Sequence, residues 1–217
     1  GEQADLELLR EVDLPAETVR FIELYRIEGN LFTHPADLLE MQYTLKEDHA
    51  EYPQAKKGQT ISSEVGAGQL PTVLDRLTVI PGGKKTPIFG LVNVNTAGAE
   101  VLAALSDIDE NLARRIVSKR GSLDDTALGT PAWLYTEGLV DARLFKMVVR
   151  RVTSRGFQFR VRCVGFGRPS GQFRVLEVVV DLVRGPQRIF YVRDITRLGL
   201  PIAMDVSLET QTVGTGR

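Results

Sequence analysis

Hydrophobic residues recur at two different intervals along the chain, and the change between them falls near Gly156. Before this point the apolar positions have a helical spacing, as in residues 17–25, where Val19 and Ile22 share one face. After it, residues 157–163 alternate between apolar and polar types, which is typical of a strand with one face in a core. The pattern predicts an α+β protein with its helices first and its sheet towards the C-terminal end.

The helical part is expected to contain several short helices. In the first half they cover residues 6–12 and 17–25, and Pro35 opens a third, because proline is suited to the first turn of a helix. The helices predicted in the second half are one through residues 101–105, one over residues 111–119, one opened by Thr130-Pro131 and one over residues 142–153.

Strands are predicted on both sides of the second helical group. Residues 73–80 and 88–94 are apolar, β-branched runs on either side of a Pro-Gly-Gly turn, so we expect two strands, or one strand and an extended lead-in, before the helices. Near the C-terminal end, alternating runs joined by glycine-containing turns predict an antiparallel meander. Its strands cover residues 157–163, 173–183 and 189–193. The alternation slips near Val175, as it would at a β-bulge.

These patterns divide the chain into six predicted segments. Residues 43–72 are polar and show no clear periodicity, which predicts a linker or mobile loop. The last residues end in Val-Gly-Thr-Gly-Arg and are expected to form a loose tail. The segments are 1–42 (first helical repeat), 43–72 (linker or mobile loop), 73–95 (strands leading into a helical hairpin), 96–155 (second helical repeat), 156–200 (antiparallel sheet) and 201–217 (loose tail).

The two repeats are stretches about 94 residues apart that share a plan. Residues 13–17 and residues 107–111 each combine acidic residues with an apolar one, and each leads into a helix that ends at an arginine, Arg26 or Arg120. A short helix opened by proline comes next in both places. We interpret the two stretches as a structural repeat, the alternative being two unrelated helical hairpins with ordinary caps.

Charge is balanced over the whole chain but unevenly distributed along it. The formal net charge is -1, which gives no general attraction to nucleic acids or anionic membranes. Residues 1–51 carry 13 acidic and four basic residues, whereas residues 143–174 carry nine basic residues and no acidic one. This basic stretch is the candidate interaction surface, represented by Arg143, Arg150, Arg151, Arg160 and Arg162.

Residues able to support catalysis or to hold a metal ion are few. A single cysteine, Cys163, excludes an intrachain disulfide and a zinc site built from several thiolates. The two histidines, His34 and His49, lie near no recognisable nucleophile motif, so we expect no enzymatic activity. Four carboxylates near the linker could collect a calcium ion, but they lack the spacing of a calcium-binding loop, so we expect no cofactor. These carboxylates are Glu40, Glu47, Asp48 and Glu51.

The spacing of apolar residues from Leu102 to Ile116 is that of a helix-hairpin-helix motif. Its frame consists of Leu102, Leu105, Ile108, Ala113 and Ile116. In the DNA-binding form of the motif, glycines on both sides of the central apolar residue let backbone amides approach a phosphate closely. Asp107 and Asp109 occupy these positions here, and two carboxylates repel phosphate. We therefore interpret the hairpin as a scaffold for protein contacts.

The starts of the two hairpin helices carry residues suited to capping. Asn95 or Thr96 is expected to cap the exposed amides of the first helix. Asp107, with Glu110 three residues further on, is expected to begin the second helix as a capping box. Both assignments give these polar residues a structural role in the hairpin.

The alternative function is that of a helix-hairpin-helix protein that binds nucleic acid through residues 143–174. Clustered arginines supply the electrostatic part of such binding. We favour a solvated helix face followed by the outer side of a strand, because Arg160 and Arg162 alternate strictly with apolar residues. Phe157 and Phe159 fall on the opposite side of that strand, where they would not stack on bases.

Several stretches taken together resemble the K-type minor pseudopilin of bacterial type II secretion. The most specific is Asn-Val-Asn-Thr-Ala-Gly-Ala-Glu-Val-Leu, at residues 93–102. The others are Leu77-Thr78-Val79, the hairpin as far as Arg120, the Trp133-Leu134 helix and Tyr191-Val192-Arg193-Asp194. The resemblance covers residues 73–194, and the first helical repeat fits the same plan.

The resemblance implies a fold and a place of action. It implies helical repeats of the helix-hairpin-helix or SAM-like kind, inserted into a pilin-like fold whose C-terminal sheet packs on an N-terminal membrane helix. It further implies a subunit without an active site, which caps the tip of a periplasmic pseudopilus together with other minor pseudopilins and is anchored to the inner membrane.

Two departures from the family limit what the resemblance implies. No stretch approaches the ~20 apolar residues that a membrane span needs, so the membrane helix is expected upstream of Gly1, and we expect no membrane contact from the sequence at hand. Residues 22–30 also replace the acidic motif that precedes calcium-binding residues in some relatives, so calcium is not expected.

Overall fold

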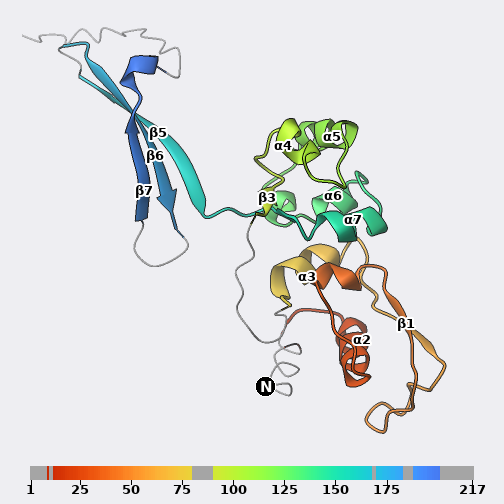
Figure 1. Ribbon diagram of the computed structural model, residues 1–217. Helices are drawn as coiled ribbons and strands as arrows, with labels where there is room; N and C mark the ends of the chain where they lie inside the picture. The colour runs from red at the N-terminus through yellow and green to blue at the C-terminus, as the bar shows by residue number, and fades with distance from the viewer. Residues whose placement is uncertain (1–8, 10–11, 80–89, 168–169, 183–187, 201–217) are drawn as a thin grey trace, which may run out of the picture. The chain divides into compact units, whose positions relative to one another are not determined.

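In the 217-residue chain, the computed structural model describes residues 9, 12–79, 90–167, 170–182 and 188–200. They belong to two compact units, Gly1–Arg155 and Gly156–Arg217, each with its own secondary structure (Figure 1). The first unit is mainly helical and the second is a sheet, which confirms the predicted α+β class. Over the described residues, none of the helices is both long enough and apolar enough to cross a membrane.

The first half of the first unit combines helices with a small β-hairpin. Its elements are α2 (Ala16–Ile27), η1 (Pro35–Leu38), a 3₁₀ helix, β1 (Gln42–Thr44), β2 (Thr60–Ser62) and α3 (Leu70–Arg76). Helix α2 buries Val19 and Ile22, which lie on the face that the helical spacing predicts. The helix predicted at residues 17–25 and the short helix opened by Pro35 are therefore confirmed. The helix predicted at residues 6–12 lies mostly outside the described residues.

The structure of residues 43–72 differs from the linker expected there. Strands β1 and β2 pair in antiparallel register, and the loop between them is closed where the Leu45 N–H donates to the Gln59 carbonyl at 3.0 Å. Leu45 and Ala55 are buried against Leu24 of α2. This ordered structure was not predicted because the polar groups of the loop are held by hydrogen bonds, and such bonds leave no periodic pattern of apolar residues in the sequence.

Helix α3 (Leu70–Arg76) occupies the first half of the segment for which a strand is predicted, so the prediction of a strand over residues 73–80 is wrong. Pro71 stands in the first turn of this helix. Leu70 and Val73, three residues apart, are both fully buried. The β-branched composition favoured a strand, but this spacing follows the helical period, and the proline supplies a helix start.

The second half of the first unit is a set of short helices between two paired strands. Its elements are β3 (Val92–Asn93), α4 (Ala99–Ala103), α5 (Glu110–Arg120), η3 (Ala127–Gly129), α6 (Trp133–Thr136), α7 (Ala142–Val148) and β4 (Val152–Thr153). Strands β3 and β4 pair in parallel, so this half begins and ends side by side. The helix predicted over residues 142–153 stops at Val148, because the following residues turn into β4. The strand predicted at residues 88–94 is described from Gly90 onwards and is regular at β3 alone.

One cluster of buried side chains connects the two halves of the first unit. It includes Phe21 and Leu39 from the first half and Trp133 and Phe145 from the second, each at most 1% exposed. The two halves therefore share one hydrophobic core. The structural repeat stays a prediction, because the helix at residues 6–12, which would complete the first copy, lies mostly outside the described residues.

The second unit is a three-stranded antiparallel meander, as predicted. Its elements are β5 (Gln158–Phe166), β6 (Phe173–Asp181), β7 (Arg188–Asp194) and the 3₁₀ helix η4 (Thr196–Leu198). Strand β5 pairs with β6 without a break, whereas the pairing of β6 with β7 shifts between Val179 and Val180. The bulge therefore lies further along β6 than the slip predicted near Val175. The tail predicted at residues 201–217 lies outside the described residues.

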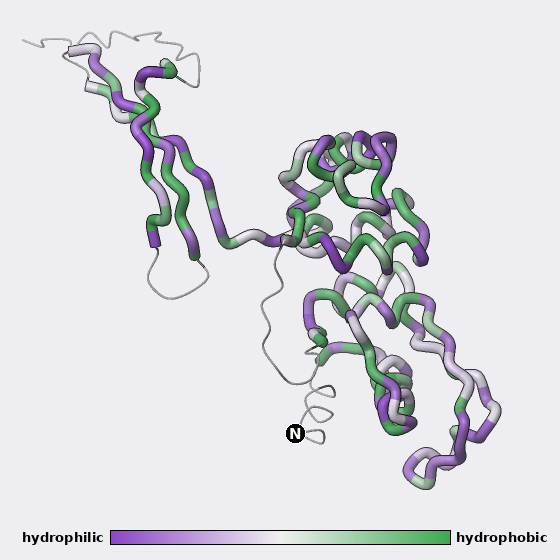
Figure 2. Tube along the Cα trace, in the orientation of Figure 1, coloured by the Kyte–Doolittle hydropathy of each residue, from purple (hydrophilic) through white to green (hydrophobic). Residues whose placement is uncertain are grey.

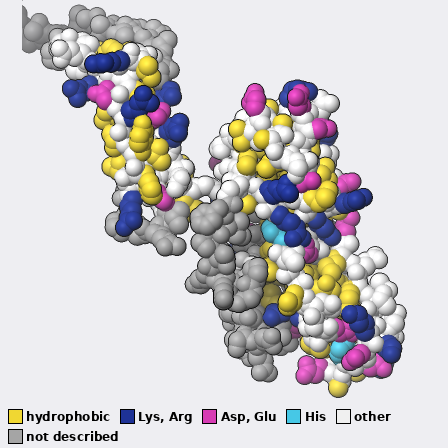
Figure 3. All heavy atoms as spheres, viewed as in Figure 1, with side chains coloured by type: hydrophobic (Ala, Val, Ile, Leu, Met, Phe, Trp, Pro, Cys, Tyr) yellow, Lys and Arg dark blue, Asp and Glu magenta, His cyan; other side chains and the backbone are white. Residues whose placement is uncertain are grey.

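One face of this sheet is apolar and exposed. Polar and apolar residues alternate along β5 (Figure 2), and the register places Phe159 opposite Val180 of β6. Phe159 is 49% exposed and Val161 is 42% exposed, although the alternation predicts a face within a core. Hydrophobic side chains run along the sheet in Figure 3. Among the described residues of this unit, Val175 and Ile195 are the buried apolar ones.

Candidate functional site: the hairpin of α4 and α5

Helices α4 and α5 lie side by side, and we call the pair with its connection the hairpin (Figure 1). That it is a helix-hairpin-helix motif stays a prediction. Most of the frame is at most 3% exposed, namely Leu102, Ile108, Ala113 and Ile116. Leu105 is partly buried against the same core. The six-residue connection between the helices turns inwards at Ile108, which holds the turn against the core while its neighbours point outwards.

Asp109, and not Asp107, caps α5. The Asp109 carboxylate accepts a hydrogen bond from the Leu112 N–H at 2.7 Å, which satisfies one of the free amides at the helix start. Asp107 instead lies 3.4 Å from a guanidinium nitrogen of Arg151. The predicted capping box at Asp107 is therefore wrong, because Ile108 is anchored in the core and the cap lies two residues later, at Asp109.

The first hairpin helix has no side-chain cap, so the role predicted for Asn95 or Thr96 is also wrong. The cap position of α4 is Gly98. The Asn95 side chain instead donates to two backbone carbonyls, of Leu128 at 2.8 Å and of Ser154 at 3.0 Å. Its carbonyl oxygen accepts a hydrogen bond from the indole N–H of Trp133 at 3.1 Å. Asn95 therefore links the start of the hairpin to α6 and to the chain after β4.

Arg120, like Asn95, joins the hairpin to distant backbone through side-chain hydrogen bonds, and this was not predicted from the sequence. It lies in the last turn of α5, and one guanidinium nitrogen donates to the carbonyls of Val94 at 3.0 Å and Ala97 at 2.7 Å. The end of the second hairpin helix is thereby tied to the segment before the first. An arginine near a helix end is common, since it also favours the helix dipole, so its sequence position alone carries no signal of this contact.

The hairpin turn is poorly suited to bind a phosphate group. Asp109 already occupies the N-terminus of α5, where a phosphate would otherwise accept amide hydrogen bonds. Glu110 adds a carboxylate in the first turn of the helix. The partly buried Asp107 adds a further negative charge beside them. Nothing in the described residues of the hairpin supports the nucleic-acid alternative.

The five arginines of the candidate interaction surface divide between the two units. Arg143, Arg150 and Arg151 belong to the first unit, and Arg160 and Arg162 to the second. Three of the five face carboxylates. The pairs are Arg150 with Asp37 at 2.6 Å, Arg151 with Asp107 at 3.4 Å and Arg162 with Glu177 at 3.3 Å. In the described structure the basic stretch is therefore partly neutralised by ion pairs. The role of these arginines in binding a partner stays a prediction.

Two of the four carboxylates considered for calcium make other contacts. Glu40 accepts a hydrogen bond from the Tyr135 hydroxyl at 2.5 Å, and Asp48 accepts one from the Lys57 N–H at 2.8 Å. In the parts of the chain that the structure describes, no three or more His, Cys, Asp or Glu side chains are grouped so as to hold a metal ion.

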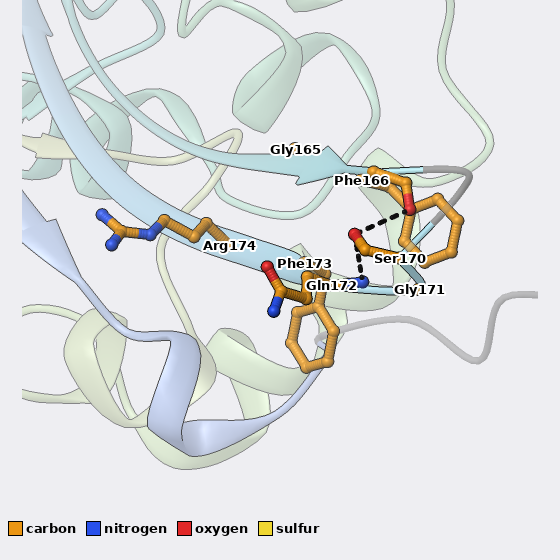
Figure 4. Close-up of a pocket in the computed structure, with 8 residues that line it drawn as sticks. Gly165, Phe166, Ser170, Gly171, Gln172, Phe173 and Arg174 are labelled. Carbon is orange, nitrogen blue, oxygen red and sulfur yellow. Dashed lines mark hydrogen bonds between the residues drawn. The ribbon is translucent and has the colours of Figure 1, made fainter.

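An open hollow lies at the end of the β5–β6 hairpin (Figure 4). Its lining includes Phe166, Phe173 and Arg174. The Ser170 hydroxyl lies 3.5 Å from the Gly167 carbonyl, to which it donates, and accepts from the Gln172 N–H at 3.3 Å. These contacts organise the turn itself, and the lining that is described brings no histidine or carboxylate to the serine.

The hairpin of α4 and α5 lies within a segment that is similar to a known protein family. Residues 92–129 match the model of Type II secretion system (T2SS), protein K. No curated protein and no solved structure matches the chain. The match supports a relationship with type II secretion protein K, over this short region of the 217 residues.

The matched segment contains the structural features that define the hairpin. It begins at β3, ends at η3, and includes Asn95, the Asp109 cap and Arg120. The description of that family names a protein of the type II secretion system, so the match associates this region with type II secretion. The match includes the stretch at residues 93–102 on which the resemblance chiefly depends. It is shorter than the resemblance, which extends over residues 73–194.

Proposed function

We propose that this protein is a minor pseudopilin-like subunit of a type II secretion apparatus and acts through protein contacts without catalysis. The observation that carries the proposal is the match of residues 92–129 to the protein K family. The geometry of that segment is compatible with a scaffold, because Asn95 and Arg120 fasten both ends of the hairpin through side-chain hydrogen bonds. Acidic side chains at the turn are also compatible with this role.

The proposal includes partners and a location. The partners are other minor pseudopilins at the tip of the pseudopilus, and the protein works in the periplasm while anchored to the inner membrane. In a pilin-like fold the apolar face of the β5–β7 sheet would receive the N-terminal membrane helix. The exposure of Phe159 and Val161 on that face is consistent with such a contact.

Gene deletion in the native host tests the role in secretion. We expect deletion to abolish export of type II substrates and the wild-type gene to restore it. We also expect the tagged protein to co-purify with the other minor pseudopilins of the same apparatus. Normal export in the deletion strain would overturn the proposal.

A surface variant tests the part played by the hairpin. Val101 lies on α4 and is 52% exposed, so Val101→Asp should leave the fold intact while it changes the hairpin surface. We expect this variant to lower co-purification with the minor pseudopilins. Leu31→Asp is the matched control, because Leu31 is 81% exposed and lies outside the matched segment. Equal effects of the two variants would argue against a specific role of the hairpin.

A further inference from the structure

A histidine stands at the contact between η1 and the end of α7, two elements that are distant in sequence. His34 is the cap residue of η1, and its ring nitrogen Nδ1 accepts a hydrogen bond from the Ala36 N–H at 3.1 Å. The His34 N–H donates to the carboxylate of Asp37 at 3.0 Å. These two bonds form a reciprocal capping box, which requires an unprotonated Nδ1.

Arg150, just beyond α7, contacts the residues around η1. One of its guanidinium nitrogens lies 2.6 Å from Asp37, and the other donates to the Thr33 hydroxyl at 2.8 Å. Burial alone would raise the pKa of Asp37, but the hydrogen bonds from Thr33 and His34 and the charge of Arg150 lower it. The carboxylate therefore stays ionised at neutral and mildly acidic pH, and it holds the turn and α7 together.

The charged groups around His34 come from both elements. Arg150 opposes protonation of the imidazole from the α7 side, and Asp37 of η1 favours it. Lys146 of α7 lies close enough to Asp37 and Glu40 for their charges to act on it. Burial of the ring has the largest effect and lowers the pKa of His34, Arg150 lowers it further, and Asp37 offsets part of this change.

We propose that His34 makes the contact between η1 and α7 sensitive to pH. The contact is closed while the imidazole is neutral and loosens when Nδ1 takes up a proton from solvent. An imidazolium has two donors and no acceptor, so the bond from the Ala36 N–H is lost. The new charge also lies near Arg150. Because neutral His34 is favoured in the fold, its contribution is complete above about pH 6.5, the usual value for histidine, and falls as the pH drops below it.

Amide hydrogen exchange provides the test. Exchange of the amides of residues 36–40 is measured on the full chain between pH 7.5 and pH 5 and corrected for the intrinsic dependence of exchange on pH. We expect these amides to open roughly five- to tenfold more often at the acidic end, the size of effect that loss of a helix cap produces. The same amides in His34→Asn should show no such change, because asparagine accepts the cap hydrogen bond without titrating.

Two further variants separate His34 from other causes. The chain has two histidines, so His49→Asn removes the second titrating imidazole and should leave the pH effect at residues 36–40 in place. Arg150→Gln removes the nearby positive charge and should move the NMR titration midpoint of His34 upwards. The proposal is overturned if exchange at residues 36–40 is independent of pH, if His34→Asn keeps the full effect, or if His49→Asn abolishes it. None of these results depends on a role in secretion.

Discussion

Single polar side chains, each with several hydrogen bonds, organise the first unit. Glu28 follows α2, and its side chain is 3% exposed. It accepts hydrogen bonds from the Tyr43 hydroxyl at 2.6 Å, from the Lys46 N–H at 2.8 Å and from the Glu47 N–H at 3.2 Å. His49 lies 3.1 Å from the same carboxylate. One buried carboxylate thus orders the beginning of the loop between β1 and β2.

Replacing Glu28 with glutamine should destabilise the protein in a pH-dependent way. Burial alone would raise the pKa of Glu28, but hydrogen bonds from Tyr43, His49 and two backbone amides lower it from 4.5 to about 2. A lowered pKa means that the stabilisation is present above about pH 4.5 and is lost as the pH falls towards 2. We expect Glu28→Gln to lower the free energy of unfolding by about 2 kcal/mol at pH 7.

Urea denaturation from pH 7 down to pH 3 measures this effect. The difference between wild type and Glu28→Gln should shrink as the pH falls below 4.5. Glu47→Gln is the control, because the Glu47 side chain lies on the exposed surface of the same loop and should change stability little. A constant difference at all pH values would mean that the ionised carboxylate does not hold the loop.

Asn95 is the second such residue, and its removal should be costly. Asn95→Ala breaks three hydrogen bonds and removes the acceptor of the Trp133 indole N–H. Trp133 is 1% exposed, so this donor cannot bond to water instead. We expect a loss of about 2–4 kcal/mol in the free energy of unfolding. Trp133 is the single tryptophan, so its fluorescence in a urea titration reports directly on this site. Asn111→Ala, at an exposed position on α5, should cost far less.

At the scale of elements, α5 depends on a cap that can be tested against its neighbour. Asp109→Ala removes the acceptor for the Leu112 N–H and should lower the free energy of unfolding by about 1 kcal/mol. Asp107→Ala removes an ion pair in which Arg151 is largely exposed, so we expect about 0.5 kcal/mol or less. Urea denaturation of the two variants under the same conditions compares them. A larger loss for Asp107→Ala would restore the capping box predicted from the sequence.

The elements that sequence reasoning predicted well are those whose signals are local. Helix α5 has a periodic apolar face, and the strands of the second unit alternate in hydropathy, so both could be predicted from neighbouring residues, although the cap of α5 was assigned to Asp107 in place of Asp109. Helix α3 was missed because a β-branched run outweighed Pro71 and the spacing of Leu70 and Val73. The hydrogen bonds of the Asn95 and Arg120 side chains could not be predicted. Their partners lie 23 to 59 residues away and are mostly backbone carbonyls, which carry no sequence signal.

At the scale of the whole molecule, the two units differ in how much of their apolar surface is buried. The first unit has a continuous core from Phe21 to Val152. The sheet of the second unit leaves Phe159 and Phe190 about half exposed or more, at 49% and 65%. A three-stranded sheet gains stability chiefly from a covered apolar face, so the first unit should account for most of the stability of the chain.

A fragment of residues 1–155 tests this difference. We expect it to unfold cooperatively in urea with the same midpoint as the full chain when Trp133 fluorescence is followed, because the tryptophan and its core lie within this unit. We also expect the fragment to bind much less of a hydrophobic dye than the full chain, since the exposed face of β5–β7 is absent. Phe159→Thr in the full chain should lower dye binding in part and leave the Trp133 transition unchanged. Loss of the cooperative transition in the fragment would show instead that the first unit needs the sheet for its stability, and the assignment of the apolar face to an outside contact would then fail.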